Sequence, residues 1–201
     1  MDIAIVLYDG FDNLDAIGPF EVFNHARSLG ADVEIGLHTL SPQDVVTSSH
    51  GLRVQPDGVL PDDPDLVVVP GGGWGVRAEE GAWGEAQRGD IPEVLSSLHA
   101  DGGTIAGVCT GGMLLASAGL TDGTPAVTHR DALDDLRDTA AEVVDARVVD
   151  AGDIVTAGGV TSGIDLALHL VEREFGQDVA TRVATVMEYE PRGQVYETEA
   201  K

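Results

Sequence analysis

Residues 104–112 of the chain read Thr-Ile-Ala-Gly-Val-Cys-Thr-Gly-Gly, and this stretch decides the fold that we expect. Residues 104–108 form a short apolar run, which is typical of a strand buried on both faces in a parallel sheet. The small residues over 111–118 predict a helix that begins directly after the turn at Cys109. A strand, a sharp turn and a helix make the repeating unit of an α/β protein.

Glycines flank Cys109, the only cysteine of the chain, at two residues on either side, Gly107 and Gly111. This is the layout of the nucleophile elbow of hydrolases, with sulfur in place of the serine oxygen, and the glycines allow the tight turn. We expect the helix dipole and free N–H groups to stabilise the thiolate and lower the pKa of Cys109. A free cysteine is commonly a small core residue, but a core position does not need glycines on both sides. The pattern favours a nucleophile.

Strands and helices alternate along the rest of the chain. We expect strands over 3–7, 33–37, 66–69, 104–108 and 154–157, weaker strands at 127–128 and 147–149, and helices over 16–29, 91–100, 111–118, 131–138, 162–174 and 178–188. Ser162 followed by Asp165 is the pattern of a capped helix start. The alternation predicts a mostly parallel sheet in a three-layer α/β sandwich of the flavodoxin-like type. We expect one domain over residues 1–190 and a C-terminal tail over 191–201.

The composition is strongly acidic, with 35 Asp and Glu against 11 Lys and Arg and a formal net charge of −24. Such a charge repels nucleic acid and anionic membranes, so neither is expected as a partner. The acids are either sites for cations or, as we favour, a solvated surface adapted to high salt. No apolar run approaches the ~20 residues of a membrane span. A single cysteine cannot form an internal disulfide, and no secretory signal is evident, so we expect a cytoplasmic protein.

Three segments follow strands of the predicted sheet: residues 9–19, 71–75 and 107–112. Ligands of parallel α/β proteins bind beyond the carboxyl ends of the strands, so we expect these segments to converge. The three glycines at 71–73 lack the spacing of a phosphate-binding loop. They are either a flexible turn or a source of backbone N–H groups that, with the N–H of Thr110, form an oxyanion-type hole beside Cys109.

Other candidate residues have competing interpretations. Asp15 precedes a predicted helix and is either its N-cap or a proton donor or acceptor in the cleft. Glu21, one turn further into the helix, could equally be a solvated acid. His129 could pair with Cys109 as a base, although a lone histidine is more often structural. The remaining histidines show no metal-ligand spacing, and with one cysteine and no HExxH motif we expect no protein-built metal site: His25, His38, His50, His99 and His169.

The motifs resemble those of the ThiJ/PfpI superfamily, which has the class I glutamine-amidotransferase-like fold. Any one of them alone would be weak, but together they are specific for the superfamily. The resemblance covers nearly the whole chain and is carried by Leu14-Asp15-x-x-Gly18-Pro19-x-Glu21-Val22, Val69-Pro70-Gly71-Gly72, Val108-Cys109-Thr110-Gly111, Thr128-His129 and Gly158-Gly159-Val160-Thr161-Ser162-Gly163-Ile164-Asp165.

Within the superfamily the Asp15 and Cys109 motifs are most similar to those of isonitrile hydratases, which convert R–N≡C and water into an N-substituted formamide without a metal or organic cofactor. The resemblance implies that Cys109 attacks the terminal carbon to give a thioimidate, that Asp15 shuttles protons and positions the water, and that Thr110 supports this carboxylate. It also implies a homodimer with the active site near the subunit interface, and a small electrophile as substrate. The implied pocket residues are Gly72, Gly73, His129, Gly159 and Val160.

Two departures from related patterns narrow the expected chemistry. Protease-like relatives carry histidine directly after the cysteine, where this chain has Thr110, and deglycase-like relatives carry glutamate at the position of Asp15. The alternatives are glyoxalase or deglycase chemistry on 2-oxoaldehydes with Cys109 and His129, or a non-catalytic sensor or chaperone. The LDxxGPxEVF motif also occurs in AraC-type regulators. Those add a helix-turn-helix domain, which we do not expect because few residues follow the last helix and the charge opposes DNA.

Overall fold

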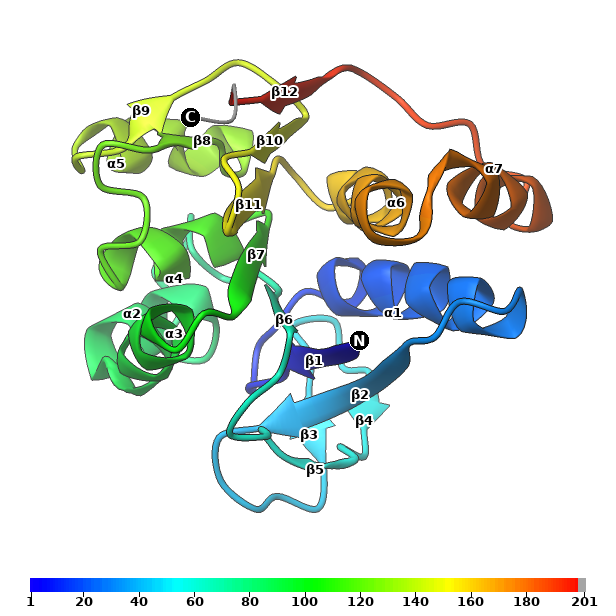
Figure 1. Cartoon of the computed structure of the whole chain (residues 1–201). Helices are drawn as coiled ribbons and strands as arrows, with labels where there is room; N and C mark the ends of the chain where they lie inside the picture. Colours follow the sequence, from blue (N-terminus) through cyan, green and yellow to red (C-terminus); the bar gives the residue numbers. More distant parts are fainter. Residues whose placement is uncertain (199–201) are drawn as a thin grey trace.

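An eight-stranded sheet forms the middle layer of the structure, a computed structural model in which residues 1–198 are described (Figure 1). The strand order is β12-β10-β11-β7-β6-β1-β2-β5, and every neighbouring pair is parallel except β10 and β11. The prediction of a mostly parallel sheet is confirmed. The strands are β1 (Asp2–Val6), β2 (Glu34–Thr39), β5 (Gly58–Val59), β6 (Leu66–Val69), β7 (Thr104–Val108), β10 (Val148–Asp150), β11 (Ile154–Ala157) and β12 (Val195–Glu197).

Helices cover both faces of the sheet, which confirms the single-domain α/β sandwich. Helices α1, α6 and α7 pack together on one face, and α2, α3 and α4 pack together on the other (Figure 1). A short 3-10 helix, η1, and helix α5 follow β8, and two small ribbons, β3 with β4 and β8 with β9, lie outside the main sheet. The bounds are α1 (Asn13–Ser28), α2 (Ala82–Arg88), α3 (Asp90–Ala100), α4 (Gly111–Ser117), η1 (Arg130–Ala132), α5 (Leu133–Arg137), α6 (Ser162–Phe175), α7 (Gln177–Val186), β3 (Val46–Thr47), β4 (Arg53–Val54), β8 (Pro125–Ala126) and β9 (Glu142–Val143).

The central strands are apolar along their whole length because helices cover them on both sides. All four residues of β6 and all four of β11 are buried. In the register of the sheet, Val69 lies beside Gly107 and Val108 lies beside Ala157. The segments that follow β6, β7 and β11 therefore leave the sheet at the same edge, which brings Gly71, Cys109 and the residues after Ala157 together.

The predicted capping pair at the start of α6 is wrong. The N-cap of this helix is Thr161, with no side-chain cap bond, and Ser162 is already helical. The carboxylate of Asp165 accepts hydrogen bonds from Arg147 Nε, from the Tyr189 hydroxyl and from the backbone N–H of residue 192. These partners come from segments distant in the chain, so local spacing could not reveal that they would replace the cap.

The weaker predicted strands divide between two sheets. Residues 148–150 join the main sheet as β10, close to the predicted 147–149. The other strand forms at 125–126 rather than 127–128 and pairs with β9 outside the main sheet. Val127 leaves the ladder because its N–H donates to the hydroxyl of Thr156 at 3.0 Å.

The segment predicted as a C-terminal tail contains a strand. Residues 195–197 form β12, which pairs in parallel with β10 at the edge of the sheet. The sheet therefore continues past residue 190, where we placed the end of the domain, and residues 199–201 of the predicted tail lie outside the described residues. Within the described part of the chain, no helix combines the length and apolar character that crossing a bilayer requires.

Candidate active site

Cys109 lies at the turn between β7 and α4 in a strained backbone conformation. Its φ is +57°, in the left-handed region that non-glycine residues rarely adopt, which costs about 1–3 kcal/mol. Neighbouring groups hold the turn: the N–H of Cys109 donates to the carbonyl oxygens of Ala157 (3.1 Å) and Gly158 (3.0 Å). The carbonyl of Cys109 accepts a hydrogen bond from the Thr128 hydroxyl at 2.8 Å. The geometry is that of a nucleophile elbow.

The flanking glycines allow the start of α4 to approach the neighbouring strands. A Cβ on Gly111 would lie 2.0 Å from the carbonyl oxygen of Val69, and one on Gly107 would lie 2.9 Å from the N of Gly112. Both contacts are with backbone, which cannot move aside. The two glycines are therefore required by close packing, while the left-handed residue of the turn is the cysteine itself.

Asp15 is available for chemistry because another residue caps its helix. The N-cap of α1 is Asp12, whose Oδ1 accepts from the N–H of Leu14 at 3.1 Å. Asp15 lies in the first turn and is 0% exposed. Its Oδ2 accepts from the N–H of Gly71 at 3.0 Å, and its Oδ1 is buried without an aligned partner among the described residues. The N-cap interpretation of Asp15 is therefore wrong, since the cap lies three residues earlier.

The side chains of Asp15 and Cys109 interact, and both pKa values are raised. Burial, and then the charge of Asp12, raise the pKa of Asp15 to about 8, against the opposing effects of the Gly71 N–H and the thiol. Burial, and then the charge of Asp15, raise the pKa of Cys109, against hydrogen bonds from the N–H groups of Val160 and Thr110. The expected lowering of the Cys109 pKa is wrong for the resting site, because burial and a neighbouring carboxylate outweigh the N–H donors. Because the two side chains interact, they titrate as a coupled pair.

The glycine loop after β6 holds this pair from the other side. The N–H of Gly71 points to Asp15, and the N–H of Gly72 donates to Thr110 Oγ1 at 2.9 Å. These N–H groups, which we expected to form an oxyanion-type hole beside the sulfur, are thus engaged with side chains. The backbone donors at the sulfur come instead from Thr110 and Val160. The hydroxyl of Thr110, expected to support Asp15, accepts from Gly72.

The segment after β11 supplies the remaining predicted pocket residues. Val160 has φ of +37°, a second strained position, and a hydrogen bond from its backbone N–H lowers the pKa of Cys109. Gly159 packs against the ring of His129, because a Cβ there would lie 2.5 Å from His129 Cδ2. His129 Nδ1 accepts from the N–H of Asp131 at 3.2 Å. His129 therefore reaches the site through Gly159, while the group that interacts directly with the sulfur is Asp15.

Two supporting residues escaped the sequence reasoning. Tyr8 is buried beside the pair, and its hydroxyl donates to the carbonyl of Pro70 at 2.6 Å. Burial and the charges of Asp15, Glu85 and Cys109 raise the pKa of Tyr8. Thr128, which binds the carbonyl of the elbow, was noted only as part of the Thr128-His129 motif. Tyr8 directly precedes residues 9–19, the first of the three converging segments, and this position in the sequence could have marked it as a candidate residue.

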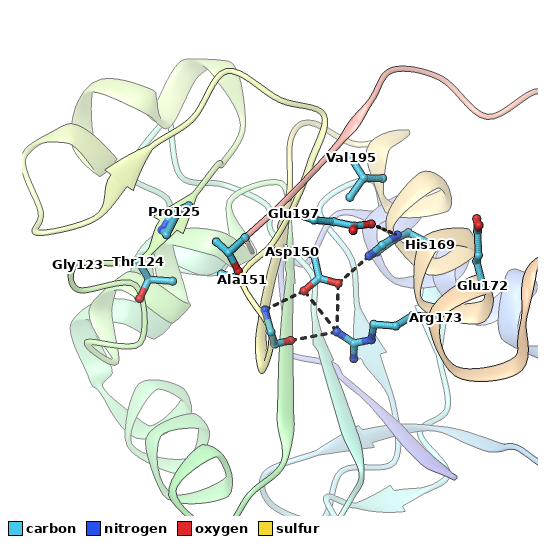
Figure 2. Close-up of a pocket in the computed structure, with 12 residues that line it drawn as sticks. Gly123, Thr124, Pro125, Asp150, Ala151, His169, Glu172, Arg173, Val195 and Glu197 are labelled. Atoms are coloured by element: carbon cyan, nitrogen blue, oxygen red, sulfur yellow. Dashed lines mark hydrogen bonds and ion pairs between the residues drawn. The ribbon is translucent and has the colours of Figure 1, made fainter. Parts of the chain in front are cut away.

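A large hollow lies elsewhere in the molecule, between β10, β12 and α6 (Figure 2). It has a volume of about 740 Å³, and its lining includes neither Cys109 nor Asp15. Cys109 itself is 6% exposed. Among residues 1–198, no group of three or more His, Cys, Asp or Glu side chains is arranged to hold a metal ion.

Four of the charged or titratable side chains of this hollow, Asp150, His169, Arg173 and Glu197, form one cluster (Figure 2). Asp150 binds His169 Nε2 at 2.7 Å and Arg173 at 3.2 Å, and it accepts from the N–H of Gly152 at 2.8 Å. His169 Nδ1 lies 4.0 Å from Glu197. Because these residues belong to β10, α6 and β12, the cluster holds the edge of the sheet against the helix, and we interpret it as structural.

Asp150→Asn is expected to destabilise the protein by about 2 kcal/mol near pH 6, because it leaves the Arg173 guanidinium and the His169 ring without their carboxylate partner. Burial raises the pKa of Asp150, but His169, Gly152 and Arg173 outweigh burial and lower it overall. A lowered pKa stabilises above the unfolded value near 4 and is lost as pH falls through the folded value. Urea unfolding at pH 6 and pH 3 should show the gap between the two proteins shrinking on acidification. A constant gap would contradict the ionic role.

Comparisons with known proteins match nearly all of the chain to members of one protein family. The sequence profile of the DJ-1/PfpI family matches residues 1–173. The isonitrile hydratase of Pseudomonas putida is 34% identical over 95% of this chain and 79% of its own length. The HTH-type transcriptional regulator CdhR of Pseudomonas aeruginosa is 30% identical over 91% of this chain, which spans 53% of the regulator. A THiJ/PfpI family protein from Pseudomonas syringae superposes with a TM-score of 0.84 at 29% identity, covering 95% of this chain and 76% of that one.

Proposed function

The chain belongs to the DJ-1/PfpI family, and on that premise we propose that it is a cysteine-dependent hydratase that adds water to isonitriles. The family includes enzymes such as isonitrile hydratase and also transcription regulators. The choice between an enzyme and a regulator for this chain therefore depends on the residues around Cys109. The observation that carries the proposal is the buried pair of Asp15 and Cys109, whose side chains interact and whose pKa values are both raised. This pair can deliver a proton to carbon and recover it from water without a cofactor.

In the first step, the sulfur of Cys109 forms a bond to the terminal carbon of R–N≡C. The thiol proton passes through the Asp15 carboxyl to that carbon, which gives the thioimidate Cys–S–CH=N–R. Because the pKa of Asp15 is raised to about 8, its carboxyl exchanges protons readily near neutral pH. The N–H groups of Val160 and Thr110 stabilise the negative charge on sulfur during the transfer.

In the second step, Asp15 takes a proton from water, and the hydroxide adds to the thioimidate carbon. Asp15 passes the water proton to the nitrogen, and the C–S bond breaks as the added hydroxyl becomes the carbonyl of the formamide R–NH–CHO. The proton that this hydroxyl loses returns to the Cys109 sulfur through Asp15. Atoms balance as R–N≡C plus H₂O, and no oxidant or reductant is consumed.

The assay that tests this function compares two substrates with the same protein. We expect hydration of p-nitrophenyl isocyanide to the formamide and little turnover of methylglyoxal, measured at both low and high salt. The glyoxalase alternative depends on His129 as base; the interaction of Asp15 with the thiol and the packing of His129 against Gly159 support Asp15 instead. Inactivity on several isonitriles at the preferred salt would overturn the proposal. Turnover of methylglyoxal alone would support the alternative, and inactivity on both substrates would favour a sensor or chaperone.

We further propose that the working form is a cytoplasmic homodimer adapted to high salt. The net charge of −24 makes self-repulsion large, and salt at molar concentration reduces the screening length to about 3 Å. Sedimentation analysis across a salt series is expected to show a dimer, with melting temperature rising with salt. A monomer at all protein concentrations would contradict the homodimer, and a melting temperature independent of salt would contradict the adaptation to high salt.

A further inference from the structure

The residues after β11 act on Cys109 at its backbone and at its thiol. The carbonyl of Gly158 accepts from the N–H of Cys109 at 3.0 Å, and a hydrogen bond from the backbone N–H of Val160 lowers the pKa of the thiol. Val160 adopts φ of +37°, which a β-branched residue does not hold unless its neighbours impose it. The contacts that fix the segment 158–161 therefore determine where this N–H points.

One residue, Arg147, binds both ends of that segment, with its backbone carbonyl at one end and its guanidinium at the other. The carbonyl of Arg147 accepts from the N–H of Gly158 at 3.0 Å, and its guanidinium donates from NH2 to Thr161 Oγ1 at 2.9 Å. The strained Val160 lies between these two anchors. Thr161 makes no side-chain cap to α6, so its hydroxyl is free to serve Arg147.

The guanidinium of Arg147 is itself held in place. Its Nε donates to Oδ2 of Asp165, whose side chain is 5% exposed. The same carboxylate accepts from the Tyr189 hydroxyl at 2.9 Å and from the backbone N–H of Arg192 at 2.9 Å. A carboxylate that accepts from several donors fixes the planar fork of the arginine.

We propose that Arg147 is a positioning residue for the Cys109 thiol, acting by holding residues 158–161 so that the Val160 N–H is aimed at the sulfur. An effect of Arg147 on isonitrile turnover rests on the proposed function, whereas its effect on the reactivity of the Cys109 thiol does not. Arg147 lies outside the motifs that identify the family, and it acts through Thr161 and Val160 without touching the sulfur.

Because Cys109 is the only cysteine, alkylation by iodoacetamide reports this thiol alone. The test is the pH dependence of that alkylation in Thr161→Val, which removes the acceptor of Arg147 at an exposed position. Weakening a hydrogen bond to the thiolate should move the profile upward by about half to one pH unit, which slows the reaction at a fixed pH roughly three- to tenfold. Arg147→Lys, which keeps the charge but loses the fork, should move it in the same direction.

Arg173→Ala is the matched control. It removes another guanidinium that pairs with a buried carboxylate, Asp150, but it does not contact residues 158–161. We expect it to lower the melting temperature and leave the alkylation profile in place. The other titratable groups at the thiol, Asp15 and Tyr8, and His129 beyond Gly159, are unchanged in all these variants.

The outcomes separate this inference from the proposed function. An upward shift in Thr161→Val and Arg147→Lys but not in Arg173→Ala supports it, even if the protein hydrates no isonitrile. Profiles of Thr161→Val and Arg147→Lys that coincide with the wild type overturn it, whatever happens to turnover. An equal shift in Arg173→Ala also overturns it, because the effect would then follow from general destabilisation.

Discussion

Asp15→Asn is expected to stop isonitrile hydration and to make the folded protein more stable at pH 8. Both effects have the same origin, because the site keeps an ionisable carboxyl where burial opposes its charge. Loss of the proton shuttle should lower kcat by about 10²–10⁴-fold. The asparagine is nearly the same shape and can still accept the N–H of Gly71, so the geometry of α1 is retained.

The pH dependence follows from the pKa of Asp15, which is raised from 3.8 to about 8. Between these values the native state binds a proton that the unfolded chain releases, so the stability of the wild type falls as pH rises through this window. Asparagine removes the penalty. Its stability advantage should therefore widen by about 2–4 kcal/mol between pH 5 and pH 8, allowing for the coupling of Asp15 to Cys109.

Urea unfolding at the two pH values measures this advantage, and Glu21→Gln is the control. Glu21 lies on the same helix but is exposed, so its neutralisation should change stability by less than about 0.5 kcal/mol at either pH. An advantage of Asp15→Asn that is absent or independent of pH would show that Asp15 carries no such penalty. Full activity in Asp15→Asn would remove the shuttle from the mechanism.

Cys109→Ala is expected to lower hydration at least about a thousandfold, since removing a nucleophile typically leaves only the contribution of binding and positioning. Cys109→Gly should be equally inactive. Stability should distinguish the two variants, because residue 109 has φ of +57° and glycine adopts this conformation without a clash of its Cβ. We expect Cys109→Gly to be more stable than Cys109→Ala by about 1 kcal/mol.

This comparison separates chemistry from backbone strain at one position. Isonitrile assays give the loss of turnover, and thermal or urea unfolding of the two inactive variants gives the strain. Equal stability of the alanine and glycine variants would mean that the elbow holds residue 109 without strain. If both variants still hydrate isonitriles at more than about one per cent of the wild-type rate, the sulfur is not the nucleophile. Even the loss of a catalytic proton transfer lowers the rate by roughly a hundredfold or more.

Runs of apolar residues were sufficient to predict the central strands, because a strand buried on both faces needs an apolar side chain at every position. The strands over 66–69, 104–108 and 154–157 lie where the apolar runs predicted them, because both faces of each strand are covered by helices. Errors appeared where distant groups intervened. Asp165 looked like a capping residue for α6, but Arg147 and Tyr189 reach it from other segments and take its oxygens.

The sequence by itself determined the elbow: an apolar strand, glycines at two fixed positions around Cys109 and a helix of small residues leave the backbone few other conformations. Only the tertiary structure decided which group faces the sulfur and how its proton is held. Asp15 becomes the partner because α1 is capped at Asp12 and the Gly71 N–H holds the carboxylate against the thiol. Burial then raises both pKa values, against the lowering that the helix start alone predicts, because desolvation depends on every element packed around the site.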